Sequence, residues 1–321
     1  MRGEGGKARH SSPEQLLRRA SAQLGSSLQL DPREARLDAQ ILIAHALGVN
    51  RAWLAAHDRD LMTPQQIAAI ESLIARRAAG EPVAYLLGQR EFYGRMFRVT
   101  ADVLIPRPDT ELLVEAALAR LPTNGPARIL DLGTGSGCIA VTLALEVPQA
   151  EVSAVDRSPA ALAVARDNAD LLGAVNVHFA ESDWYASLGP VVPAQAGTKK
   201  TVWIPASAGM THEENQAIKT FDLIVANPPY VAAADPHLAQ GDLRFEPRGA
   251  LAAGADGLDD LRLIIAGAPA YLNPGGWLLV EHGWEQGAAC RALFEQQGYA
   301  DIATLHDLAG HERVTLGACR T

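Results

Sequence analysis

Cysteine, aromatic residues and long apolar runs are scarce in this chain of 321 residues, and each shortage excludes a class of protein. The three cysteines, Cys138, Cys290 and Cys319, are far apart and form no Cys-x-x-Cys pair, so we expect neither a disulfide framework nor a metal site. No apolar run is long enough to span a membrane. The polar first residues lack the apolar core of a signal peptide. We therefore expect a cytoplasmic protein without membrane partners.

An excess of positive charge is also lacking. The formal net charge is −9, and no stretch of the chain is markedly basic, so we expect no direct binding to nucleic acid. Hydrophobic residues make up 48% of the chain and charged residues 20%, which is typical of globular proteins. The length indicates two domains, or one large α/β domain with an extension.

The first part of the chain has a helical pattern. Apolar residues recur every three or four positions between 13 and 79, and Thr63-Pro64 is typical of an N-cap followed by the first helical residue. Alternating aromatic and polar residues around Gly94 then predict a hairpin. We divide the chain into a disordered tail (1–12), a small helical bundle domain (13–85), a β-hairpin linker (86–105) and a larger domain (106–321).

The larger domain alternates between strand and helix patterns. Strands are expected at 127–132, 151–155, 176–180, 221–226 and 277–281 and near Ile302 and Val314, with helices at 138–145, 159–172, 258–271 and 285–297. This alternation predicts an α/β fold, a mostly parallel, Rossmann-like sheet of seven strands covered by helices on both faces.

One stretch, 190–216, shows no clear period. It contains a near-duplication, Pro-Ala-Gln-Ala-Gly-Thr at 193–198 and Pro-Ala-Ser-Ala-Gly at 205–209. Because it precedes the strand at 221–226, we expect it to leave the sheet at the edge opposite the active site. We interpret it as an inserted, mobile and non-catalytic loop.

A glycine loop follows the first strand of the larger domain. Gly133, Thr134, Gly135, Ser136 and Gly137 come directly after Ile-Leu-Asp-Leu, where glycine allows positive φ angles and the close approach of a ligand. Dinucleotide enzymes require Gly-x-Gly-x-x-Gly, but the third glycine position is Cys138 here. The spacing is more similar to the loop that binds S-adenosylmethionine in methyltransferases.

Acidic and aromatic residues follow the next two strands. Asp156 ends the second strand, where a carboxylate can accept hydrogen bonds from ribose hydroxyls. Asp183 and Trp184 follow the third, where they offer an acceptor for an adenine amino group and a flat apolar wall. Three such sites at successive strand ends favour a cofactor pocket.

The sequence Asn227-Pro228-Pro229-Tyr230 follows the apolar strand at 221–226. An amide or exocyclic amine nitrogen is a poor nucleophile, and acceptors that hold both its N–H bonds turn its lone pair toward the methyl donor. Asn227 offers a side-chain oxygen and Pro228 a backbone oxygen. The prolines stiffen the loop, and Tyr230 can pack over a planar substrate group. We predict Asn227, Pro228 and Tyr230 as catalytic residues.

These motifs together resemble the HemK/PrmC family of protein-(glutamine-N5) methyltransferases. Beyond the Asn-Pro-Pro-Tyr loop, the resemblance is carried by Glu-Pro-Val-Ala-Tyr (81–85), Arg-Glu-Phe-Tyr-Gly (90–94), Leu-Ile-Pro-Arg-Pro-Asp-Thr-Glu (104–111), Phe-Glu-Pro-Arg (245–248) and Gly-Ala-Asp-Gly-Leu (254–258). It covers nearly the whole chain, excepting the tail and the insert.

The resemblance implies methylation of the side-chain nitrogen N5 of the glutamine in the Gly-Gly-Gln motif of peptide chain release factors, with S-adenosylmethionine as cofactor. It implies that the helical domain binds the release factor. Site residues are implied as well: Gly133 to Gly137, Asp156, Trp184 and Asn227 for the cofactor, and Asn227, Pro228, Pro229 and Tyr230 for the glutamine.

Three other functions remain open at this point. They are methylation of a ribosomal-protein glutamine, adenine-N6 methylation of nucleic acid, and a cofactor-binding adaptor without turnover. The motif Arg-Pro-Asp-Thr-Glu at 107–111 favours the release-factor branch, and an intact Asn227 is evidence against an adaptor. The roles of Arg107 and His282, and whether Glu246 pairs with Arg248, stay undecided.

Overall fold

The computed structural model describes residues 11–121, 126–188 and 220–320. The insert and most of the tail, about which the sequence made predictions, lie outside these residues. The chain divides into two compact units, which are described separately. Unit 1 comprises Met1–Gln89 with Ala239–Phe245, and unit 2 comprises Arg90–Leu238 with Glu246–Thr321. No helix in the described part of the chain is long and apolar enough to cross a membrane.

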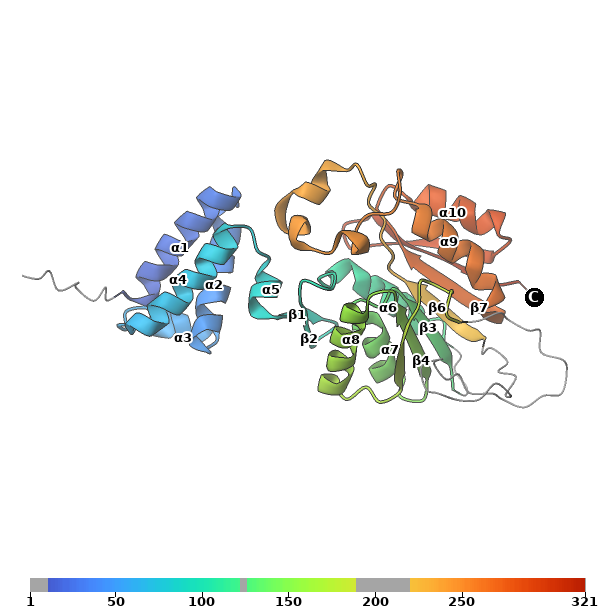
Figure 1. Ribbon diagram of the computed structural model, residues 1–321, viewed down its shortest axis with the longest axis horizontal. Coiled ribbons are helices and arrows are strands. Elements are labelled where there is room, and N and C mark those ends of the chain that lie inside the picture. The colour runs from blue at the N-terminus through green and yellow to red at the C-terminus, as the bar shows by residue number, and fades with distance from the viewer. Residues whose placement is uncertain (1–10, 122–125, 189–219, 321) are drawn as a thin grey trace, which may run out of the picture. The chain divides into compact units, whose positions relative to one another are not determined.

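Unit 1 is a bundle of short helices (Figure 1), and capping side chains fix the starts of all of these helices but the last. Ser12 and Thr63 each accept a hydrogen bond from a backbone N–H three residues on, and a glutamine there completes a capping box. The N-cap predicted at Thr63 is thereby confirmed. The helices are α1 (Pro13–Leu28), α2 (Pro32–Leu47), α3 (Arg51–Ala56), α4 (Pro64–Ala78) and α5 (Val83–Leu87).

Arg77 connects three segments of unit 1. Its guanidinium, only 8% exposed, donates to Asp38 on α2 and to Asp242, with N–O distances of 2.8 Å each. Asp242 belongs to the 3₁₀ helix η3 (Gly241–Phe245), far along the chain. A buried guanidinium is stable only when paired, so this cluster fixes the segment that follows the Asn-Pro-Pro-Tyr loop against the helical bundle.

Unit 2 contains a sheet of seven strands in the order β5-β4-β3-β6-β7-β9-β8. All pairs are parallel except those made by β9, so the predicted fold class is confirmed. The strands are β3 (Arg128–Leu132), β4 (Glu151–Asp156), β5 (Val177–Glu181), β6 (Phe221–Ala226), β7 (Leu272–Glu281), β8 (Ala300–His306) and β9 (Glu312–Ala318). β7 begins five residues earlier than predicted, because Pro274-Gly275-Gly276 resembles a turn but continues the strand.

A separate hairpin precedes the sheet. β1 (Gln89–Phe92) and β2 (Arg95–Arg98) are joined by Tyr93 and Gly94, whose φ angles of 52° and 72° are those of a two-residue type I′ turn. Phe92 and Phe97 are fully buried and belong to the main core of unit 2.

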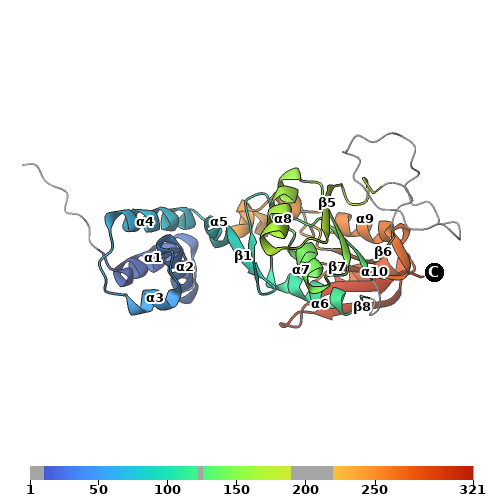
Figure 2. The same cartoon turned by 90° about the horizontal axis from the view of Figure 1, so that it is seen from below.

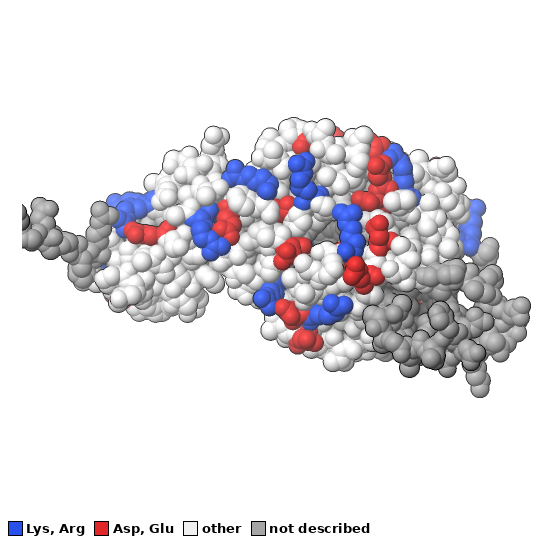
Figure 3. Space-filling view, viewed as in Figure 1, with Lys and Arg blue, Asp and Glu red and all other residues white. Residues whose placement is uncertain are grey.

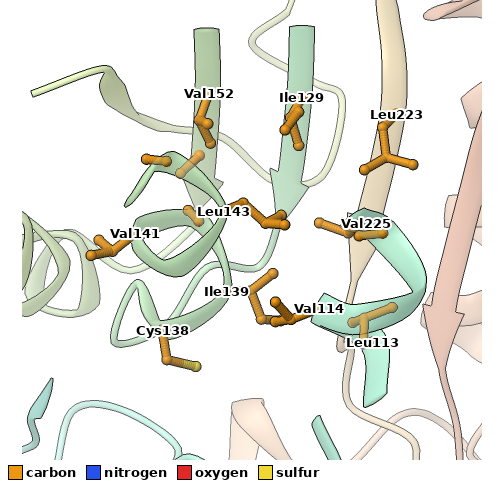
Figure 4. Packing of buried hydrophobic residues seen from close by; sticks show 14 of the residues in the cluster. Leu113, Val114, Ile129, Cys138, Ile139, Val141, Leu143, Val152, Leu223 and Val225 are labelled. Carbon is orange, nitrogen blue, oxygen red and sulfur yellow. The ribbon is translucent and has the colours of Figure 1, made fainter. Parts of the chain in front are cut away.

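The sheet of unit 2 is covered on both faces. Side chains of β6 alternate between two clusters, with Leu223 and Val225 in one and Ile224 and Ala226 in the other, as the period of a strand requires. Figure 4 shows the first cluster, where residues of two helices meet the strands. Its helices are α6 (Glu111–Leu118), α7 (Cys138–Glu146) and α8 (Pro159–Leu172), and those of the second are α9 (Asp259–Gly267) and α10 (Gly287–Gln296) (Figure 2).

The chain order reverses at β3, which places two loops beside each other. β4 follows β3 on one side, and β6 pairs with β3 on the other, with Leu132 opposite Ala226. The loops after β3 and β6 therefore leave the same edge of the sheet at a topological switch point, where ligands bind in open α/β sheets.

Candidate active site

A cavity of about 240 Å³ lies at the carboxyl ends of β3, β4, β5 and β6. Most of the residues predicted for the site line it: Gly133, Thr134, Gly135, Ser136, Asp156, Asp183, Trp184, Asn227 and Pro229. Gly137, Pro228 and Tyr230 are not among the lining residues. The sequence did not point to other parts of the wall, notably Asp102, Val103, Leu104 and Pro106 before α6 and Pro247, Gly249 and Ala250 after the Asn-Pro-Pro-Tyr loop.

The glycine loop needs glycine for its backbone conformation and, at two positions, for the space around it. All three have positive φ angles, 72° at Gly133, 55° at Gly135 and 80° at Gly137. A Cβ on Gly137 would lie 3.1 Å from the Cβ of Ala165 on α8, whereas one on Gly135 would meet no atom of the described residues within 4 Å. Gly137 thus permits close packing of helices, and Gly135 keeps the backbone accessible on the cavity side.

Two aspartates hold this loop. Asp156 accepts the N–H of Gly135 at 2.9 Å with one carboxylate oxygen and the N–H of Ser158 at 2.9 Å with the other. Asp131, beneath the loop, accepts the hydroxyl of Thr134 at 2.7 Å. Burial raises the pKa of Asp131 to about 7, and its Oδ1 has no partner among the described residues. Asp156 therefore offers a carboxylate to a ligand at this end of the cavity, whereas Asp131 supports the loop from below.

Trp184 is fixed as one wall of the cavity. Its indole lies against Gly133, where a Cβ would be 3.1 Å from the ring, and its Nε1 donates to Asp260 at 3.2 Å. The backbone at Trp184 has a φ of 48°, and its carbonyl accepts the Ser182 hydroxyl at 2.8 Å. Asp260, on α9, was missed because nothing in the sequence links it to the distant Trp184.

The Asn227 side chain lies at the cavity with its two ends in different surroundings. Its Nδ2 donates to the Thr110 hydroxyl at 3.1 Å. Its Oδ1 is buried and has no hydrogen-bond partner among the described residues. A buried acceptor without a partner costs free energy unless a ligand donates a hydrogen bond to it. This oxygen is therefore a candidate acceptor for an N–H group of a ligand.

Tyr230 has a different place from the one expected. Its ring packs against the second core cluster, and its hydroxyl donates to Glu281 at 3.4 Å. Burial raises the pKa of this hydroxyl, so it stays protonated. Its carbonyl accepts Nε2 of Gln286 at 2.9 Å. Tyr230 therefore anchors the loop rather than lining the cavity.

The three undecided residues now have defined contacts. Glu246 pairs with Arg107 rather than with Arg248, and it also accepts the N–H of Ile105 at 3.0 Å. Glu246 thus holds the segment before α6, and Arg107 lines the cavity. His282 is fully buried and hydrogen-bonds the Gly283 carbonyl and the Thr315 hydroxyl at 2.9 Å each, which is a structural role. Burial lowers its pKa.

The sequence and the fold match known proteins. Residues 15–88 match the PrmC N-terminal domain family, and residues 124–305 match the methyltransferase domain family. A solved structure, the hMettl16 catalytic domain, has a TM-score of 0.50 at 15% identity and covers 78% of this chain and 82% of its own. At that identity it supports the fold alone.

Curated relatives are similar over almost their whole length. The release factor glutamine methyltransferase of Bordetella pertussis is 52% identical over 290 residues, 90% of this chain and 97% of the relative. The protein of that name from Escherichia coli is 44% identical over 301 residues, 94% of this chain and 96% of the relative. The chain therefore belongs to the family of release factor glutamine methyltransferases, enzymes that use S-adenosylmethionine.

Proposed function

We propose that this enzyme methylates the side-chain nitrogen N5 of the glutamine in the Gly-Gly-Gln motif of peptide chain release factors. The observation that carries the proposal is the unpartnered Oδ1 of Asn227, buried at the same cavity as the glycine loop. A glutamine amide has two N–H donors, and one of them satisfies this oxygen. The names of the relatives support release factors as the substrate, and a cytoplasmic location follows from that substrate.

The chemistry required of the chain is positioning. The cofactor, when bound, supplies an activated methyl group. Asn227 Oδ1 and the Pro228 carbonyl each accept a hydrogen bond from one of the two N–H groups of the substrate amide. These two hydrogen bonds turn the nitrogen lone pair toward the methyl carbon. Such fixed acceptors in a buried site contribute to catalysis because they need no reorganisation during the reaction.

We assign the cofactor to the other half of the cavity. The backbone of the glycine loop, from Gly133 to Gly137, approaches it closely. Asp156 is held by two backbone N–H groups and accepts the ribose hydroxyls. Asp183 accepts the adenine amino group, and the ring of Trp184 packs against the adenine.

The surface charge supports a protein substrate. On the face seen in Figure 3, acidic and basic side chains are interspersed, and the chain has a net charge of −9. An adenine-N6 methyltransferase acting on nucleic acid needs positive charge along the phosphate backbone.

A direct experiment is to incubate the protein with labelled S-adenosylmethionine and a purified release factor, and to map the product by mass spectrometry. We expect one added methyl on the glutamine of the Gly-Gly-Gln tripeptide. A release factor with alanine in place of that glutamine is the control. Label on a ribosomal protein, on nucleic acid, or on the control release factor would contradict the proposal.

We further propose that residues 13–85 bind the body of the release factor. The exposed large apolar side chains of unit 1 include Trp53 at 37% and Leu61 at 74%, and exposed apolar residues often mark protein interaction sites. Replacing both by serine should raise KM for the intact release factor and leave activity on a short Gly-Gly-Gln peptide unchanged. An unchanged KM for the intact factor would refute this role.

A further inference from the structure

We propose that Thr110 and Glu281 are positioning residues that determine which end of the Asn227 amide faces the substrate. This inference rests on the proposed function, in which Asn227 must present its oxygen rather than its nitrogen. An asparagine amide has nearly the same shape in its two flipped orientations, and only its hydrogen bonds distinguish them. A flipped Asn227 would offer N–H groups to a substrate amide that also offers N–H groups.

The three side chains come from three different elements of unit 2. Asn227 follows β6, and Glu281 is the last residue of the neighbouring strand β7, where Ala226 lies opposite Val280. Thr110 ends the 3₁₀ helix η1 (Pro108–Thr110). It is 2% exposed, and Glu281 is 1% exposed. Water therefore does not compete for the hydrogen bonds between them.

The direction of the hydrogen bonds follows from counting protons. A side-chain hydrogen bond with Thr110 lowers the pKa of Glu281, and in a bond between a hydroxyl and a carboxylate the hydroxyl is the donor. A hydroxyl has one proton, so the Thr110 oxygen can then only accept. Asn227 must turn its Nδ2 to Thr110, as observed at 3.1 Å. The amide oxygen is then left without a hydrogen-bond partner among the described residues, and on this proposal it is the end that meets the substrate amide.

A role in packing alone does not explain Glu281. The three residues before it in β7, Leu278, Leu279 and Val280, are fully buried apolar side chains. Glu281 instead places a carboxyl group in the core, where one oxygen accepts the Tyr230 hydroxyl and Oε2 has no partner among the described residues. Burying a carboxyl group whose oxygens are only partly hydrogen-bonded costs free energy of folding. The presence of Glu281 at this position therefore indicates a role other than packing.

We call the two hydrogen bonds that link Asn227, Thr110 and Glu281 the relay. The direction of these hydrogen bonds depends on the charge of Glu281. Burial, the largest cause, and Asp109 raise the pKa of Glu281, whereas the Thr110 hydroxyl, Arg313 and the Tyr230 hydroxyl lower it, and the net pKa is about 7. Cys138 also lies near enough to interact electrostatically, but burial raises its own pKa to about 12, so this thiol stays neutral. When protonated, Glu281 can donate to Thr110, which then donates to Asn227 and favours the flipped amide. Activity should therefore rise with pH through the neutral range.

The first test compares Thr110→Val with Thr110→Ser. Valine keeps the shape of threonine and removes the hydroxyl, whereas serine keeps the hydroxyl and removes a methyl group. The relay predicts that Thr110→Val lowers kcat at least about tenfold, with little change in the binding of S-adenosylmethionine, and that Thr110→Ser keeps kcat within about threefold. A packing role predicts the reverse order. Wild-type kcat in Thr110→Val would overturn the proposal.

The second test needs no turnover, so it separates the relay from the proposed function. The side-chain NH₂ of Asn227 is assigned in nitrogen-15 NMR spectra by comparison with Asn227→Ala. In the wild type and in Thr110→Ser, its proton exchange should be slow because Nδ2 is bonded to Thr110. In Thr110→Val it should be faster by about tenfold or more. Equal exchange in all three proteins would refute the relay, even if the wild type methylates release factors.

The third test addresses Glu281. Glu281→Gln keeps an acceptor oxygen for Thr110 and for Tyr230 but cannot ionise, so it should retain part of the activity with a profile of kcat that is flat between about pH 6 and pH 8. The wild-type profile should rise over this range. A rising profile in Glu281→Gln that matches the wild type would show that another group titrates and would overturn the role of Glu281.

Discussion

Replacing Asn227 by alanine removes the side-chain oxygen that we assign to the substrate amide. The lost oxygen is buried and has no other partner among the described residues, so the interaction takes place in a low dielectric. Removing one such group from a preorganised site costs about 3 kcal/mol of transition-state stabilisation, or 10²- to 10³-fold in kcat. We therefore expect Asn227→Ala to reduce kcat by roughly this factor.

Stability and cofactor binding should change far less. The variant loses one hydrogen bond, from Nδ2 to Thr110, worth about 1 kcal/mol of the free energy of unfolding. The glycine loop, Asp156 and Trp184 remain in place, so the Kd for S-adenosylmethionine should rise no more than about fivefold. Steady-state kinetics on a release factor, calorimetric titration and urea denaturation measure the three quantities.

Asn176→Ala is a matched control. Asn176 donates to the carbonyls of Ala144, Val147 and Ala150 at 3.1, 3.4 and 2.9 Å, at the sheet edge opposite the cavity. Its replacement should cost about 1–3 kcal/mol of stability and leave kcat unchanged. The reasoning fails if Asn227→Ala retains kcat within about threefold, or if its loss of activity equals that of the control at the same loss of stability.

Three further changes test the rest of the site. Asp156→Ala removes the carboxylate that accepts the Gly135 N–H and should weaken S-adenosylmethionine binding at least about tenfold; unchanged calorimetric affinity would exclude the ribose assignment. Gly137→Val places side-chain atoms against Ala165, where even a Cβ lies at 3.1 Å, and should lower stability by about 1–3 kcal/mol, read from the Tm. Asp131 has a pKa of about 7 when folded, well above its unfolded value of 3.8, so the folded state binds the proton more tightly. Stability should therefore fall as pH rises from about 4 to 7, and urea denaturation of Asp131→Asn should show a smaller slope; an equal slope would exclude Asp131 as its source.

The sheet and the strand-end residues could be predicted because local rules specify them. Parallel strands that are buried on both faces are apolar runs, and β6 is such a run, so its existence and its end at Ala226 were evident. The residue after each run then lies at one common edge. The sequence alone therefore predicts that Gly133, Asp156 and Asn227 lie together, and all three line the cavity.

Contacts between distant segments could not be predicted in this way. Glu246 binds Arg107 across 139 residues, whereas the sequence pointed only to its neighbour Arg248. Asp260 holds Trp184 across 76 residues. A single sequence gives periodicity within an element but no register between elements, so each acidic residue has many basic or polar candidates and no local rule to choose among them.

Polar residues at the ends of the apolar strands lie at the active-site edge of the sheet, and this rule also applies to Glu281. It is the first charged residue after the apolar run at 277–280, and its strand neighbours that of Asn227, so the same argument that selected Asp156 also reaches Glu281. Thr110 follows no strand. It reaches the site because Arg107 and Ile105, a few residues before it, bind the buried Glu246. A residue that approaches an active site from a loop depends on such long-range contacts, and only the structure reveals them.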